Sequence, residues 1–111
     1  MRVVVTGMGV IAPNGNTVPE YWNSLISAKS GIDHISYFDT SNFPVKIAGE
    51  ISNFDPENHF ERKEVRKLDP FSIYALVACS EAIEMSGLNS YDFNNERAGV
   101  MVGCGIGGIN T

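Results

Sequence analysis

Residues 69–87 constrain the fold most, because they predict a helix that is apolar on almost every side. Asp69 suits the N-cap, Pro70 suits the first helical position, and Gly87 suits the helix end. The first half of this helix reads Phe-Ser-Ile-Tyr-Ala-Leu-Val-Ala-Cys, so apolar side chains point in most directions. A helix of this kind needs cover from several neighbouring elements.

Two short apolar segments predict strands. Residues 2–6 contain three consecutive valines, and residues 98–102 are similarly apolar. Strands of this composition are typical of parallel sheets that helices cover on both faces. A helix capped by Thr17 and reaching about Ala28 is also predicted, together with a short strand within residues 45–51.

The predicted elements have more apolar surface than they can bury against one another. Two helices are too few to cover the predicted sheet and the apolar helix. The sequence also reaches Thr111 within a glycine-rich turn that follows the second apolar segment. We therefore expect an α/β fold that is incomplete in this chain, as in the N-terminal part of a larger enzyme. Further layers would come from additional sequence or from a partner chain.

Composition excludes several classes of protein. A chain of 111 residues with 43% hydrophobic residues suits one packed domain. Eight basic and thirteen acidic residues give a net charge of −5, which disfavours general binding of nucleic acid. No apolar run has the length of a membrane span, and the opening residues do not resemble a signal peptide. We expect a cytoplasmic protein with no nucleic-acid or membrane partner.

Cysteine and histidine residues do not suggest a metal site. Cys79 and Cys104 are too few for a disulfide framework, and His34 and His59 are distant from both in sequence. Cys79 is expected to be buried inside the apolar helix. Cys104 lies in the glycine-rich turn, where packing is a simpler role than reactivity because no histidine is nearby in sequence to act as a base.

Two glycine patterns formally match the dinucleotide-binding fingerprint. They are Gly7-x-Gly9-x-x-Ala12 and Gly103-x-Gly105-x-x-Gly108. The fingerprint requires a helix N-terminus directed at the pyrophosphate. A proline-containing turn stands where the first pattern needs that helix, so close packing explains its glycines better. The second pattern leaves a dinucleotide-binding fragment open as an alternative.

Four of the eight basic residues lie within six positions, at Arg62, Lys63, Arg66 and Lys67. On sequence alone, the simplest interpretation is a solvated charged segment that pairs with neighbouring Glu61 and Glu64. The alternative is a docking surface for an acidic partner, whose association the positive charge would accelerate.

Taken in order, these segments resemble the opening of the type II β-ketoacyl-[acyl-carrier-protein] synthases. The resemblance covers nearly all of the chain, and its specificity lies in the order of the motifs. They are Arg2-Val3-Val4-Val5-Thr6-Gly7-Met8-Gly9, Pro13-x-Gly15-Asn16, Tyr21-Trp22, Ser30-Gly31-Ile32, Phe38-Asp39-Thr40-Ser41, Ala48-Gly49, Arg66-Lys67-Leu68-Asp69-Pro70-Phe71 and Gly103-x-Gly105-Ile106-Gly107-Gly108.

The resemblance implies the start of the first half of a layered thiolase-like (α/β/α/β/α) fold, with residues 1–111 as a partial N-terminal ketoacyl-synthase domain. It implies a homodimeric enzyme of fatty-acid elongation that needs no cofactor. Such enzymes transfer an acyl group from acyl carrier protein to a cysteine, and a decarboxylated malonyl unit then attacks it in a Claisen condensation. Ketosynthases of polyketide assembly share these motifs and remain an alternative, as does a stand-alone module that binds carrier protein.

The resemblance also assigns roles to individual residues. The family's catalytic cysteine, two histidines and lysine lie beyond its glycine turn, so no catalytic residue is expected here and the isolated chain should be inactive. Lys63, Arg66 and Lys67 match basic residues that contact the acidic carrier protein. Ile106 matches an isoleucine that lines the end of the acyl pocket near the dimer interface. Cys104 departs from the commonest pattern, in which a serine or another small residue stands.

Overall fold

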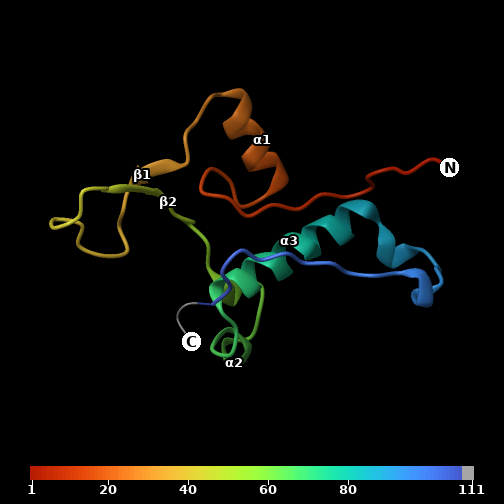
Figure 1. The fold of residues 1–111 in the computed structure, drawn as a ribbon. Helices are drawn as coiled ribbons and strands as arrows, with labels where there is room; N and C mark the ends of the chain where they lie inside the picture. Colours follow the sequence, from red (N-terminus) through yellow and green to blue (C-terminus); the bar gives the residue numbers. More distant parts are fainter. Residues whose placement is uncertain (109–111) are drawn as a thin grey trace. The chain divides into compact units, whose positions relative to one another are not determined.

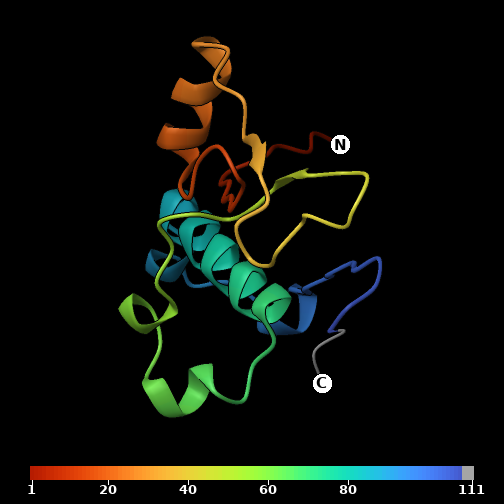
Figure 2. The same cartoon turned by 90° about the vertical axis from the view of Figure 1, so that its left-hand side faces the viewer.

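The computed structural model describes residues 1–108, which divide into two compact units. One unit is Val10–Phe54, and the other joins Met1–Gly9 to the residues from Asp55 onward. Figures 1 and 2 show the ribbon from two directions. The elements in chain order are α1 (Val18–Ile26), β1 (Ile32–His34), β2 (Ile47–Gly49), η1 (Pro56–Asn58), α2 (Arg62–Val65), α3 (Pro70–Ser86), η2 (Leu88–Ser90) and η3 (Asn95–Arg97), where η denotes a 3-10 helix.

The first helix, α1, begins where the sequence predicts. The Thr17 hydroxyl accepts a hydrogen bond from the Glu20 N–H at 3.4 Å, which confirms the predicted N-cap. The helix ends at Ile26, slightly before the predicted end at Ala28. Ala28 has a φ of 53°, so the backbone there has already left the helical conformation.

The turn before α1 connects that helix to the segment after β2. Ala12 and Gly15 exchange backbone hydrogen bonds of 2.9 and 3.0 Å. The Asn16 side-chain amide donates to the carbonyl oxygen of Ser52 at 2.8 Å. These bonds satisfy polar backbone groups outside regular structure and fix the entry of the chain into α1.

The two strands form an antiparallel pair in which Asp33 lies opposite Ala48. β2 lies inside the predicted segment 45–51, and this prediction is confirmed. β1 was not predicted, because three residues are too short to show a strand pattern. Its pairing with β2 establishes it as a strand, and a bond from the Ile35 N–H to the Lys46 carbonyl at 3.0 Å continues the contact.

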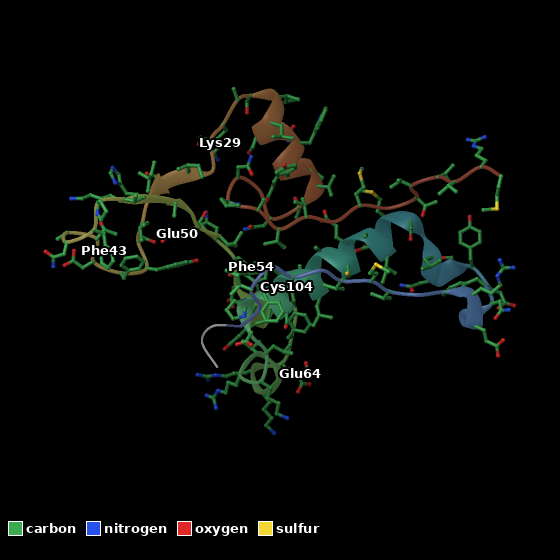
Figure 3. All side chains as sticks on the ribbon, in the orientation of Figure 1. Lys29, Phe43, Glu50, Phe54, Glu64 and Cys104 are labelled. Carbon is green, nitrogen blue, oxygen red and sulfur yellow. The ribbon has the colours of Figure 1, made fainter. Side chains whose placement is uncertain are left out.

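Hydrogen bonds and a contact between aromatic rings hold the loop between the strands. The Ser36 hydroxyl donates to the Glu50 carboxylate at 2.7 Å, and this bond is the main cause that lowers the pKa of Glu50 below its ordinary value. The rings of Phe38 and Phe43 meet edge to face with centroids 5.5 Å apart. Figure 3 labels Phe43 and Glu50 in this region. Polar and aromatic contacts thus hold this loop in a defined conformation.

In the other unit, α3 has the predicted bounds. It follows Asp69 at the N-cap, and Gly87 ends it with a φ of 65°, a conformation that glycine adopts without strain. Ile73 and Val77, one turn apart, are its buried residues at 4% and 8% exposure. The prediction that Cys79 is buried in this helix is wrong, because Cys79 is exposed. The described residues cover one side of α3 and leave other apolar positions open.

Residues 2–6 and 98–102 do not form strands, and that prediction is wrong for this structure. Val3 is 85% exposed and Met101 is 99% exposed. A strand requires hydrogen bonds to a neighbouring strand, and among residues 1–108 neither segment has such a neighbour. Their exposure agrees with the expectation that these apolar segments need more cover than this chain supplies.

The first glycine pattern packs against α3. A side chain at Gly9 would overlap the carbonyl oxygen of Ala78, and one at Gly7 would overlap that of Ala82. Close packing is therefore the structural reason for both glycines, as predicted. The first helix after this pattern starts at Val18, too late to present its N-terminus as the dinucleotide fingerprint requires.

Candidate functional site

The charged segment after Phe60 forms the short helix α2, which the sequence did not predict. The Glu61 N–H donates to the Glu64 carboxylate at 3.3 Å, which is one half of a capping box. The Lys67 N–H donates to the Glu64 carbonyl at 2.9 Å and extends the turn past the end of the helix. Local capping thus holds a segment whose side chains are mostly exposed.

This turn brings three cations to one side of the chain. Lys63, Arg66 and Lys67, named here the basic cluster, are exposed and stand at helical spacings of three and four residues. Arg66 is the C-cap and keeps a helical backbone conformation, so the spacing holds through the end of α2. Figure 3 shows side chains that end in nitrogen around α2, near the labelled Glu64.

The fourth cation of the segment behaves differently. Arg62 forms an ion pair with Glu57 of η1, with 3.5 Å between Nε and Oε1. Glu61 and Glu64 are engaged in capping α2. Among residues 1–108, the basic cluster forms no ion pair. The predicted pairing with Glu61 and Glu64 is therefore not found in the described residues, since Arg62 pairs with Glu57 instead. The positive charge of the basic cluster is available to an anionic partner.

The glycine-rich turn carries Ile106, which is 81% exposed. The Gly107 N–H donates to Sγ of Cys104 at 3.1 Å, so the thiol helps to order the turn. Gly107 has a φ of 79°, which favours glycine over any residue with a side chain. Figure 3 labels Cys104. The last three residues of the glycine-rich segment, 109–111, lie outside the described residues.

The turn meets the start of α3 at Asp69. A Cβ placed on Gly108 would overlap the carboxyl group of Asp69, so a side chain added there would displace either that carboxyl group or the turn. Asp69 occupies the N-cap as predicted, and its side chain makes no capping hydrogen bond. Sequence reasoning could not find this contact, because nothing in the spacing of the two residues indicates that they meet.

Cofactor sites are not evident in the described part of the chain. Residues 1–108 contain no group of three or more histidine, cysteine or acidic side chains arranged to hold a metal ion. The unit Val10–Phe54 contains an open polar cavity of about 520 Å³, lined partly by Asn16, Ser24 and Lys29. Neither the basic cluster nor Ile106 lines it. No helix within residues 1–108 has the length and apolar character needed to cross a bilayer.

Comparison with known families identifies the class of protein. The family model described as "Beta-ketoacyl synthase, N-terminal domain" matches residues 1–111. The chain therefore belongs to the β-ketoacyl synthase family and has the thiolase-like fold of its N-terminal domain. This confirms the fold class and the family that the ordered motifs indicated.

Curated relatives of this chain carry the name 3-oxoacyl-[acyl-carrier-protein] synthase 2. The protein of Vibrio cholerae serotype O1 is 46% identical over 108 residues, which cover 97% of this chain and 26% of that protein. The protein of Staphylococcus aureus strain N315 is 44% identical over 110 residues, which cover 99% of this chain and 27% of that protein. The chain spans about a quarter of the length of these relatives.

A solved structure supports the same fold. The ishigamide ketosynthase/chain length factor superposes with a TM-score of 0.68 and 32% sequence identity. The superposition covers 76% of this chain and 21% of the other. Most of the present chain thus has the backbone arrangement of a ketosynthase.

Proposed function

We propose that the protein carrying these residues is a 3-oxoacyl-[acyl-carrier-protein] synthase of fatty-acid elongation. The observation that carries this proposal is the 42–46% identity, over essentially the whole chain, to relatives with that name. The reaction is a decarboxylative Claisen condensation. An enzyme thiolate attacks the acyl thioester and displaces the thiolate of the carrier protein. Malonyl-carrier protein then loses carbon dioxide, and the resulting carbanion attacks the acyl-enzyme thioester and displaces the enzyme thiolate. The products are a 3-oxoacyl thioester and the free enzyme thiolate.

Within this function, residues 1–111 supply recognition and not bond chemistry. The basic cluster binds acidic acyl carrier protein, because its three cations form no ion pair within residues 1–108 and attract a negatively charged surface. Ile106 lines the end of the acyl pocket in the assembled homodimer. We assign no catalytic residue to this chain, so the 111 residues alone should be inactive. The enzyme needs no cofactor and works in the cytoplasm.

The proposal is tested with the purified protein that carries these residues. Incubated with acyl-carrier protein and malonyl-carrier protein, it should release carbon dioxide and form a 3-oxoacyl-carrier protein in equal amounts. Mass spectrometry of the carrier protein and trapping of labelled carbon dioxide give the two readouts. Absence of both, with a protein that is folded and of full natural length, would refute the proposal. Condensation by residues 1–111 alone would refute the claim that they lack the catalytic groups.

A ketosynthase of polyketide assembly is the second candidate, and the ishigamide ketosynthase/chain length factor is the observation that favours it. Its identity of 32% is lower than the 46% of the Vibrio cholerae relative. The same assay separates the two functions when carrier proteins of fatty-acid and of polyketide type compete. A fatty-acid synthase should prefer the former.

Replacing Ile106 with phenylalanine should lower kcat/KM for long acyl chains more than for short ones. The larger ring would fill volume at the end of the pocket, where only long chains reach. The comparison is made with a series of acyl-carrier proteins of increasing chain length. An equal loss at every chain length would indicate misfolding and contradict the assigned role of Ile106.

A further inference from the structure

We propose that Asp69 is a positioning residue that sets the place of the glycine turn and thereby the acyl-chain selectivity of the synthase. This inference rests on the proposed function, because it needs Ile106 to face the acyl chain. Asp69 touches neither substrate nor reacting atoms in this scheme. It acts through the turn that carries Ile106.

The first argument is the conformation of Asp69 itself. An aspartate at an N-cap ordinarily accepts a hydrogen bond from a backbone N–H in the first turn of its helix. The Asp69 carboxylate makes no such bond, although its carbonyl accepts one from the Ser72 N–H at 3.0 Å. The Asp69 side chain therefore lacks the stabilising N-cap hydrogen bond in the orientation that brings it to the glycine turn.

The second argument is the closeness of the contact. All three atoms nearest to a Cβ built on Gly108 belong to the Asp69 carboxyl group. By contrast, a Cβ on Gly103, Gly105 or Gly107 would meet no described residue within 4 Å. Of these glycines, Gly108 is thus the one at which the turn abuts another element. The Asp69 carboxyl group occupies the space beside Gly108.

The third argument is the position of Asp69 in the chain. It stands two residues after Lys67 of the basic cluster, and Gly108 stands two residues after Ile106. The contact therefore joins the segment proposed to bind carrier protein to the turn proposed to line the acyl pocket. Moving or removing the carboxyl group should move the turn, because this group fills the space beside Gly108 in the described residues.

The test measures the ratio of kcat/KM for a long acyl-carrier protein to that for a short one. The variants are Asp69→Ala, Gly108→Ala and the double variant, made in the whole synthase. Gly108→Ala should change the ratio, because its methyl group displaces the carboxyl group or the turn. In the double variant the methyl group enters the space that Asp69→Ala leaves. The effects should therefore be non-additive, by roughly two- to tenfold as for residues in contact.

Two further variants separate positioning from general destabilisation. Asp69→Asn keeps the shape of the side chain and should retain the wild-type ratio. Gly99→Ala adds a methyl group that meets nothing within 4 Å among residues 1–108, away from the Asp69–Gly108 contact, and should leave the ratio unchanged. Melting temperatures of all variants are recorded in parallel, and a loss of stability alone should lower both rates without changing their ratio.

The outcomes distinguish this inference from the proposed function. Additive effects, or an unchanged ratio in Asp69→Ala and Gly108→Ala, would overturn the positioning role while the wild-type enzyme still condenses both substrates. If the wild-type protein condenses neither substrate, the proposed function fails first and the inference falls with it. Three results together would establish the inference. The ratio changes in Asp69→Ala and Gly108→Ala, their effects are non-additive in the double variant, and Asp69→Asn retains the wild-type ratio.

Discussion

Charge reversal of the basic cluster should lower kcat/KM for carrier-bound substrates by about ten- to a thousandfold, the range by which electrostatic steering changes association rates. The triple variant Lys63→Glu, Arg66→Glu and Lys67→Glu presents negative charge where an acidic carrier protein would dock. These cations have no ion-pair partner among residues 1–108, so their replacement breaks no salt bridge of the described fold. Stopped-flow association and steady-state kinetics would measure the loss.

The salt dependence of this effect identifies its cause. The difference between wild type and variant should shrink as ionic strength rises, because exposed charges are screened within about 10 Å at 0.1 M salt. Arg62→Glu is the matched control, since Arg62 is on the same helix but pairs with Glu57 and lies outside the cluster. Arg62→Glu should lower kcat/KM for carrier-bound substrates much less than the triple variant does. Equal kinetics of the triple variant and wild type with carrier-bound substrate would contradict the docking role.

Gly9→Ala is expected to lower the free energy of unfolding by about 1–3 kcal/mol, as overpacking of a close contact does. A methyl group at this position would overlap the carbonyl oxygen of Ala78. That oxygen belongs to the backbone of α3, which cannot move without breaking helical hydrogen bonds. The segment Met1–Gly9 would therefore have to separate from the helix.

Denaturant unfolding of the wild type and the variant would measure this loss. Gly99→Ala is the control, because its methyl group meets open space in this structure. Both substitutions make the same chemical change in an apolar segment, so the difference between them isolates the contact with α3. If Gly9→Ala and Gly99→Ala had equal stability, close packing would not be the reason for Gly9.

Helix limits were predictable because they depend on residues adjacent in sequence. Thr17 caps α1 with its hydroxyl, and Gly87 supplies the left-handed conformation that ends α3. These are interactions within one turn, so residue type and order are sufficient to indicate them. The short helix α2 was missed because its charged sequence lacks the apolar periodicity by which helices are recognised.

The candidate site was predictable in part. The ordered motifs, which include Arg66, Lys67 and Ile106, identified the family, and the comparison confirmed it. The roles of these residues stay predictions. The sequence could not separate Arg62, which pairs with Glu57, from the three cations that remain unpaired in the described residues. Pairing depends on the direction in which η1 presents its carboxylate, and spacing along the chain does not specify that direction.

Sequence alone determined the α/β class, the family, the helix caps and the excess of apolar surface over available cover. The tertiary structure decided which apolar segments pair as strands, why Gly9 must be glycine, and that Asp69 turns from its own helix toward Gly108. The physical reason is the separation along the chain of the residues that interact. Capping and periodicity act between neighbours in the chain, whereas strand pairing and close packing depend on which distant backbone lies alongside.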